Sequence, residues 1–294
     1  MMKTGRFNAR ATVGAPVVAL VMAVAVTMPL FAQVADGDRH YANRAEGASG
    51  AHAKAGPIDA AIAAYSRAVA QNANDLEAHA KLLRAYRFKG AYVATSAEQK
   101  KAIYTAAKAA GERALGAVER ALATRGVKRD APAKTVANAA RSIPNAADVY
   151  LWDAINWGEW ALAYGKLAAA KQGAADRILR GATIAHLVNP KLEGGGPSRV
   201  LGRLHDQTPR IPFITGWASS KEALRFLEES HNHEPTNKLT TVFLAEAMVS
   251  NDASKKPQAV KMLRAVIAAP AHPDYTVEDA AATADARALL DKWK

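Results

Sequence analysis

Residues 146–164 read AADVYLWDAINWGEWALAY, and this stretch decides the fold. The spacing of its apolar residues predicts a helix from about Ala146 to Ala170. At 100° per residue, its aromatic side chains fall within an arc of about 80°, and its aliphatic side chains lie opposite them. The aromatic arc comprises Tyr150, Trp157, Trp160 and Tyr164, and the opposite side comprises Leu151, Ile155 and Leu162. A helix that is apolar on both sides is buried on both sides, so we expect it to be a central element.

The aromatic arc has two interpretations. Aromatic stripes at helical spacing usually fill a hydrophobic core, but they also line cavities for apolar or carboxylate-bearing ligands. Asp153 lies inside the arc. A buried acid needs a polar partner, so we expect an arginine from the basic segment described below to pair with it.

A glycine-rich segment follows at residues 191–203, with the sequence KLEGGGPSRVLGR. It lacks the Gly-Lys-Ser/Thr of a phosphate-binding P-loop, and no strand precedes it as a dinucleotide fingerprint requires. We interpret it as a permissive turn feeding a short helix that starts at Pro197. Arg199 and Arg203 lie four residues apart on that helix, where both can face a carboxylate and contribute to a ligand cavity.

The composition favours an all-α protein of antiparallel helical hairpins. The chain of 294 residues is half hydrophobic, Ala-rich and only 6% aromatic, a composition that is typical of helices rather than of β-sandwiches. It contains no Cys, which excludes disulfides, Cys-ligated zinc and a thiol nucleophile.

The N-terminus has the pattern of an export signal. Residues 1–10 carry three basic residues and no acid, and residues 11–32 carry no charge. We expect a signal peptide over residues 1–32, cleaved after Ala32, and a periplasmic location; an uncleaved membrane anchor is the alternative. Residues 33–56 show little periodicity and are predicted to be a flexible lead-in. Residues 57–294 are predicted to form a single all-helical domain.

The positive charge is concentrated in residues 81–129, where twelve Lys and Arg face three Glu. Export argues against nucleic acid as the partner. The alternatives are an acidic protein, weak contact with an anionic membrane surface, or a solvated helical face. The candidates for partner binding are Lys81, Arg84, Arg87 and Lys89.

Helical hairpins of this kind suggest degenerate tetratricopeptide-like repeats, whose period is about 34 residues. Such repeats place small residues where helices touch, a large residue between them and Pro at the end of the hairpin. The positions that fit this pattern are Ala61, Tyr65, Ala68, Leu82, Tyr86, Gly90, Ala223, Leu227 and Pro235. We therefore expect degenerate repeats around the central Trp-rich helix.

No motif specifies catalysis. The sequence has neither the Gly-x-Ser-x-Gly elbow of hydrolases nor a His-Glu-x-x-His zinc motif. His231, His233 and Glu234 resemble metal ligands, but no second cluster accompanies them. We expect no enzyme activity, no cofactor and no metal site.

Three segments resemble the T component of tripartite (TRAP-type) transporters. They are the Trp-rich run 150–160, the segment 189–202 with Asn-Pro, Gly-Gly-Gly-Pro and Leu-Gly, and the run Phe-Leu-Ala-Glu at 243–246. The resemblance implies a non-enzymatic envelope accessory protein that associates with the transporter's substrate-binding subunit and holds a small apolar organic ligand. Members of that family are often lipid-anchored, whereas this chain lacks the Cys that accepts the lipid. The alternative is a generic periplasmic repeat scaffold whose groove, lined by residues 58–92, binds peptide segments of envelope proteins.

Overall fold

The computed structural model describes residues 30–294, and within them the fold is all-α. The predicted signal peptide, apart from its last three residues, lies outside the described residues. The helices are α1 (Leu30–Ala42), α2 (Ala55–Gln71), α3 (Leu76–Tyr92), α4 (Ala97–Ala123), α5 (Ala133–Ala140), α6 (Ala146–Tyr164), α7 (Lys166–Lys171), α8 (Ala174–Val188), α9 (Leu192–Gln207), α10 (Ser220–His233), α11 (Lys238–Asn251), α12 (Lys256–Ala268) and α13 (Thr276–Lys292), with short 3-10 helices η1 (Ala253–Lys255) and η2 (Pro273–Tyr275).

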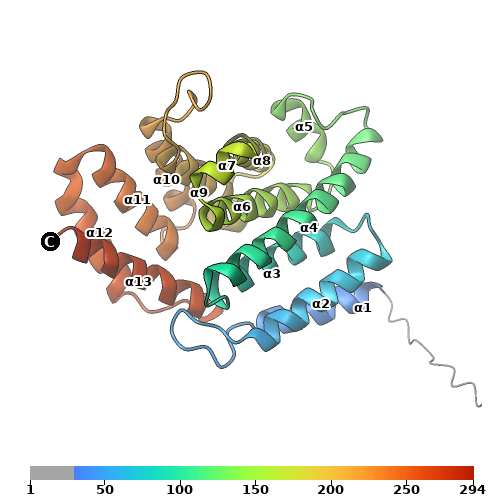
Figure 1. Cartoon of the computed structure of the whole chain (residues 1–294), viewed down its shortest axis with the longest axis horizontal. Helices are drawn as coiled ribbons and strands as arrows, with labels where there is room; N and C mark the ends of the chain where they lie inside the picture. The colour runs from blue at the N-terminus through green and yellow to red at the C-terminus, as the bar shows by residue number, and fades with distance from the viewer. Residues whose placement is uncertain (1–29) are drawn as a thin grey trace, which may run out of the picture.

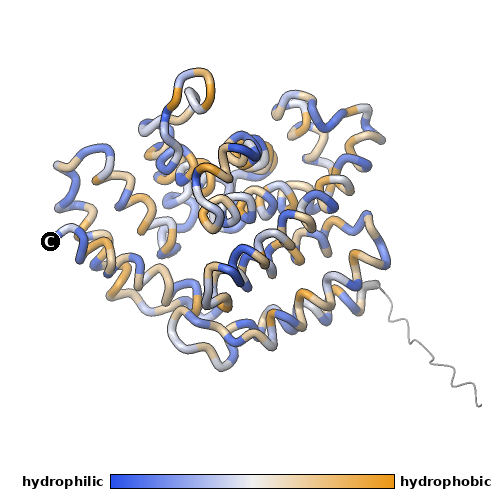
Figure 2. Tube along the Cα trace, in the orientation of Figure 1, coloured by the Kyte–Doolittle hydropathy of each residue, from blue (hydrophilic) through white to orange (hydrophobic). Residues whose placement is uncertain are grey.

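Most neighbours along the chain pack against one another as antiparallel hairpins, which confirms the predicted fold class. The hairpins follow a curved path, so that the red C-terminal helices return to the blue and cyan N-terminal ones (Figure 1). Hydrophobic and hydrophilic residues alternate along almost every helix (Figure 2). Among residues 30–294, no helix is both long and apolar enough to span a membrane.

Side-chain caps explain why several helices begin where they do. Ser96 Oγ accepts the Gln99 amide at 3.2 Å, and Gln99 Oε1 accepts the Thr95 amide at 2.8 Å. These two bonds form the capping box that the spacing of Ser and Gln predicts at the start of α4. Asp75 caps α3 in the same way by accepting the Ala78 amide at 3.0 Å.

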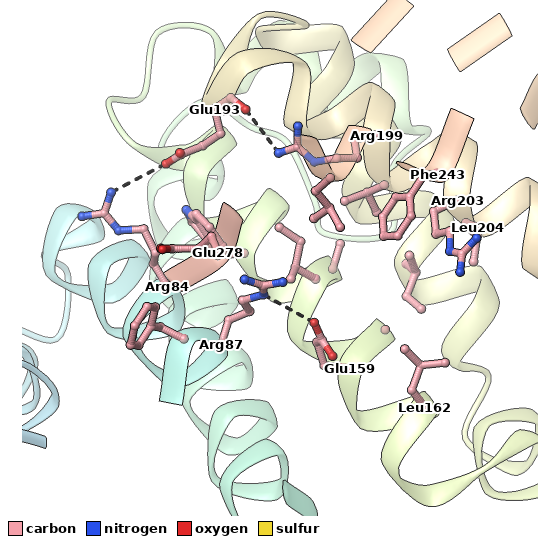
Figure 3. A pocket seen from close by; sticks show the side chains of 18 of the residues that line it. Arg84, Arg87, Glu159, Leu162, Glu193, Arg199, Arg203, Leu204, Phe243 and Glu278 are labelled. Atoms are coloured by element: carbon pink, nitrogen blue, oxygen red, sulfur yellow. Dashed lines mark hydrogen bonds and ion pairs between the residues drawn. The ribbon is translucent and has the colours of Figure 1, made fainter. Parts of the chain in front are cut away.

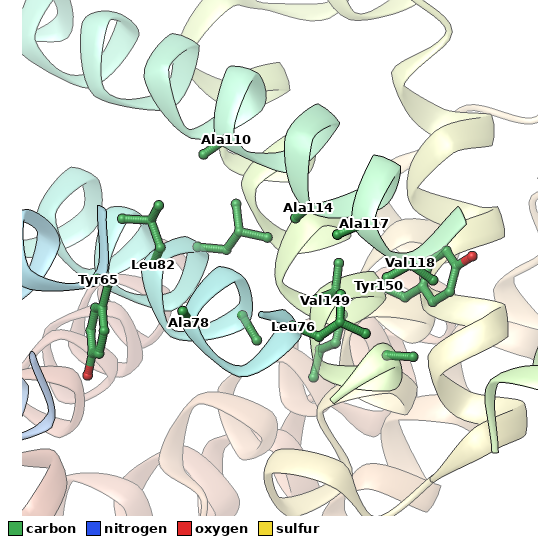
Figure 4. Packing of buried hydrophobic residues seen from close by; sticks show 14 of the residues in the cluster. Tyr65, Leu76, Ala78, Leu82, Ala110, Ala114, Ala117, Val118, Val149 and Tyr150 are labelled. Atoms are coloured by element: carbon green, nitrogen blue, oxygen red, sulfur yellow. The ribbon is translucent and has the colours of Figure 1, made fainter. Parts of the chain in front are cut away.

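Alanine lets the helices approach closely in the main core. Ala110, Ala114 and Ala117 lie along one side of α4 and face larger residues of the neighbouring helices, such as Leu82 and Val149 (Figure 4). All five side chains are at most 2% exposed. Because alanine has no flexible side chain, this close packing costs little conformational entropy.

The predicted flexible lead-in, residues 33–56, is wrong over its first half, because α1 is a helix that packs on α2. Gly37 makes this contact possible: a β-carbon there would overlap the Tyr65 ring. The Tyr65 hydroxyl donates to Asp38 at 2.7 Å, and Asp38 also accepts Lys81 Nζ at 2.7 Å. A glycine contact and paired charges hold α1 in place, together with Val34, which is buried in the main core.

An ion pair joins the two ends of the described chain. Arg44, just after α1, lies 2.9 Å from Glu278 of α13 and also donates to the Asp274 carbonyl. Its guanidinium lies 4.7 Å from the centroid of the Tyr41 ring. The side chain of Arg44 is only 8% exposed, so the curved array is closed by a nearly buried charge.

We predict that Arg44→Ala lowers the free energy of unfolding by about 3 kcal/mol, because it leaves Glu278 without its counter-charge in a poorly hydrated place. Urea denaturation would measure the change. Arg39→Ala is the control, since Arg39 is 68% exposed on α1 and its loss should cost about 0.5 kcal/mol or less. Equal effects of the two substitutions would contradict a closing role for Arg44.

Candidate functional site

A cavity of about 1600 Å³ lies inside the curve of the helices. Its walls come from both ends of the described chain: α1, α3, α6, α9 and α11 contribute, together with η2 and the start of α13. Sequence reasoning missed the contributions of Tyr41, Arg44, Tyr275 and Glu278. No local sequence pattern predicts these residues, because they lie beside the cavity only when the two ends of the helical array pack together.

The central helix α6 faces the cavity, but not with its aromatic arc. The cavity is lined by Trp152, Ile155, Glu159 and Leu162. None of Tyr150, Asp153, Trp157, Trp160 and Tyr164 is among the lining residues. The structure therefore places the candidate site on the aliphatic side of α6, opposite to the side that the aromatic pattern suggested.

The aromatic arc packs against α4 and α8 instead. The ring centroids of Trp157 and Trp160 lie 5.6 Å apart, and Trp160 stacks on Tyr164 at 4.7 Å. Lys108 Nζ lies 3.9 Å from the Trp157 centroid and 3.7 Å from that of Trp160. Arg177 covers Trp157 from α8 at 4.6 Å. These cation–π contacts cover the rings with basic side chains and leave them no cavity to line.

Tyr150 and Asp153 are buried in the same region. Asp153 Oδ1 has no hydrogen-bond partner, and it lies so close to α4 that a β-carbon at Gly111 would overlap it. Among residues 30–294, no basic group lies within ion-pair distance of Asp153, so the predicted pair with an arginine is not formed. Burial, assisted by the negative charge of Glu112, raises the pKa of Asp153 to about 7.

The basic residues predicted to bind a partner divide between the cavity and a local ion pair. Lys81, Arg84 and Arg87 of α3 line the cavity. Lys89 lies outside the lining and pairs with Asp59 of α2 at 2.7 Å. Three of these four residues therefore belong to the internal site.

Arg84 and Arg87 are each held by a carboxylate on the opposite wall (Figure 3). Arg87 Nε lies 3.4 Å from Glu159 Oε1, and its Nη1 donates to the Tyr92 hydroxyl at 2.7 Å. Arg84 Nη1 lies 3.8 Å from Glu193, a long contact. Arg84 Nε is buried and has no acceptor, so this guanidinium is only partly satisfied.

Both arginines of α9 line the cavity, but of the two that were expected to face a carboxylate only Arg203 does so. Arg203 pairs with Glu246 at 2.6 Å and with Asp206 at 3.2 Å. Arg199 donates to two neutral acceptors, the Thr240 hydroxyl at 3.0 Å and the Glu193 carbonyl at 3.3 Å.

The glycine-rich turn connects these arginines. Glu193, Gly194 and Gly195 all have positive φ angles of 48°, 61° and 80°. For Glu193 this left-handed conformation is strained. In this conformation Glu193 contacts Arg84 with its side chain and Arg199 with its backbone carbonyl. Glycine is favoured at position 194 because its φ of 61° lies in the left-handed region.

Apolar side chains line the part of the cavity that lies near α7 and the segment 208–215. Leu162, Ile211 and Ile214 line the cavity and are 78%, 46% and 66% exposed. Large apolar groups are costly to leave in water, so this part of the wall suits the apolar portion of a ligand.

The cavity wall combines paired charges with apolar surface. Its acids and bases lie mostly in ion pairs across the cavity, with apolar surface beside them. In residues 30–294, no group of three His, Asp or Glu residues is arranged to hold a metal ion. His231 and His233, the candidates for metal binding, contact Thr241 and Glu229 respectively.

No family model matches the chain, and no curated protein matches it significantly. The resemblance to the T component of TRAP transporters therefore stays a prediction.

We predict that Asp153→Asn removes a pH dependence of stability. The pKa of Asp153 in the folded protein is about 7, above its ordinary value of 3.8, so the folded state binds this proton more tightly. The free energy of unfolding should fall as the pH rises from about 4 to 7, by at most about 1.4 kcal/mol per pH unit. An uncharged Asn should abolish this fall and leave the variant more stable than wild type at pH 8.

Thermal unfolding between pH 4 and 8 would measure the effect. Asp130→Asn, which changes an exposed carboxylate before α5, is the control and should keep the wild-type profile. If the profiles of Asp153→Asn and wild type coincide, Asp153 does not carry the buried proton.

Proposed function

We propose that this chain is a non-enzymatic accessory protein that holds a small organic ligand in its central cavity. The observation that carries the proposal is the cavity itself, whose wall combines apolar side chains with a few arginines. Ligand pockets typically measure about 300–1000 Å³ and have mostly apolar walls with a few polar anchors. A cavity of about 1600 Å³ has room for such a ligand.

The envelope location and the partner belong to the same proposal. The resemblance of segments 150–160, 189–202 and 243–246 to the T component of TRAP transporters supports a periplasmic protein that associates with a solute-binding subunit. The two ideas are compatible, because a protein beside a solute-binding subunit can receive or hold the solute.

A peptide-binding scaffold is the second candidate. The large cavity volume favours it, because an extended peptide segment needs more room than a typical small ligand. The degenerate tetratricopeptide-like repeats proposed above would suit this role as well. However, the groove expected along residues 58–92 contributes only its last part, from Lys81 to Tyr92, to the cavity.

We predict that Gly158→Leu prevents ligand retention without unfolding the protein. Gly158 lines the cavity on α6, and a β-carbon there would meet only Ile178 Cδ1, 4.0 Å away. A leucine should fill part of the space and favour the helix by about 0.7–1 kcal/mol. The protein purified from its own cells would be denatured, and the released organic molecules quantified by mass spectrometry.

Gly116→Leu is the matched control. It has the same change of helix propensity on α4, and Gly116 is not among the cavity-lining residues. We expect at least a tenfold loss of the co-purified molecule in Gly158→Leu and none in Gly116→Leu. Equal amounts in both variants, or no molecule in the wild type, would refute a ligand-holding role.

The partner is tested separately by affinity capture of residues 33–294 from an envelope extract. We expect a solute-binding subunit of a transporter among the captured proteins. Capture of secretion or assembly proteins without such a subunit would favour the scaffold function instead.

A further inference from the structure

We infer that the ligand is an organic monoanion whose carboxylate lies between Arg199 and Arg87 and whose apolar body lies along Leu204 and Phe243. This inference rests on the proposed ligand-holding function and names the class of ligand.

Arg199 differs from the other wall arginines in having no carboxylate partner. Among residues 30–294, each of Arg44, Arg84, Arg87 and Arg203 has a carboxylate oxygen within 3.8 Å. Arg199 has only a hydroxyl and a carbonyl. A guanidinium has five N–H donors in a planar fork that fits a carboxylate, so Arg199 retains donors for a ligand.

The surroundings of Arg199 penalise its charge. Desolvation and the positive charge of Arg87 lower the pKa of Arg199, although Glu193 and Glu234 act in the opposite direction. Burying a cation without a counter-charge is costly. An anion placed between the two arginines would offset both the desolvation of Arg199 and its repulsion by Arg87.

A second observation points to the same part of the cavity. Arg84 Nε is buried without an acceptor, and the contact of Arg84 with Glu193 is long at 3.8 Å. Glu193 bridges Arg84 and Arg199 (Figure 3). An incoming carboxylate therefore meets a wall in which two of the three nearby guanidinium groups are incompletely paired.

The apolar portion of the ligand has a defined direction. Figure 3 shows Leu162, Leu204 and Phe243 on one side of Arg87 and Arg199, across the open space of the cavity. Leu162 is 78% exposed, so an apolar chain that covers it removes apolar surface from water. Head and tail sites lie in the same cavity, which favours an amphipathic anion over inorganic phosphate.

The lining residues include seven Lys or Arg and eight Asp or Glu, so the wall as a whole has no positive excess, and only the local pairing around Arg199 bears on the charge of the ligand. Arg84 and Arg87 already share Glu193 and Glu159, and Glu234 also lines the cavity. The one wall arginine without a carboxylate partner corresponds to one added negative charge. A dianion would bring an excess charge close to these glutamates.

Calorimetric titration of the chain with ten-carbon probes tests the inference. The probes are decanoate, decyltrimethylammonium and 1-decanol, which share an alkyl chain and differ in charge. We expect decanoate to bind at least tenfold more tightly than the other two. Arg199→Met should weaken decanoate binding at least tenfold and leave 1-decanol binding within twofold of wild type.

Arg225→Met is the control, because Arg225 of α10 is not among the cavity-lining residues and pairs with Glu222 and Glu229. It should change decanoate binding less than threefold. Arg199→Lys keeps the charge and should retain most of the binding; it also provides the comparison if Arg199→Met fails to fold.

The outcomes separate the inference from the proposed function. If 1-decanol or decyltrimethylammonium binds as tightly as decanoate, or if Arg199→Met binds decanoate normally, the anion site is refuted while the ligand-holding cavity stands. If none of the probes binds to the folded wild-type chain, both fail. A decapeptide with a free C-terminal carboxylate is titrated in parallel, and if it binds while decanoate does not, the small-anion inference is overturned in favour of the scaffold function.

Discussion

The structure depends on the need of α6 to bury two faces at once. One neighbour cannot cover a helix that carries rings on one side and aliphatic groups on the other, so the array has to curve around it. The aromatic face is covered by α4 and α8, where Lys108 and Arg177 lie over Trp157 and Trp160. The aliphatic face is covered only in part, and the incompletely filled space beside it is the cavity.

Closure of the array gives this space its far wall. The pair of Arg44 and Glu278 joins segments 234 residues apart, and a nearly buried ion pair of this kind contributes more to specificity of arrangement than to stability. The rings of Tyr41 and Phe88 lie within 5.5 Å of the same guanidinium and keep it partly dehydrated. The contact positions the C-terminal hairpin over the cavity, and α11 thereby brings Phe243 toward the wall of α6.

Local signals predicted the elements better than the site. Periodicity identified the central helix, because that signal acts within a few residues. The short helix α1, which contacts Tyr65 of α2 through Gly37 and Asp38, was missed. The aromatic rings of α6 suggested which side of the helix faces a ligand. Rings this large also pack well in a core, and the residues of α6 that line the cavity include Ile155 and Leu162 instead. Whether Arg84 lies on the surface or in a cavity depends on helices far away in the sequence. Composition does not say whether a basic residue lies on the surface or in a cavity. The spacing of Arg199 and Arg203 did indicate that both lie on one side of the same helix.

The distribution of charge in the cavity limits the cost of burying its arginines. A cavity wall with several unpaired arginines would be strongly destabilised by desolvation, whereas pairing each with Glu159, Glu193, Glu246 or Glu278 limits that cost. Leaving Arg199 on neutral acceptors confines the remaining penalty to one group. A ligand that compensates this group stabilises the folded chain in proportion to its own binding free energy. Glu193, whose backbone is strained, contacts Arg84 on α3 and Arg199 on α9 and so joins the two helices beside the proposed anion site.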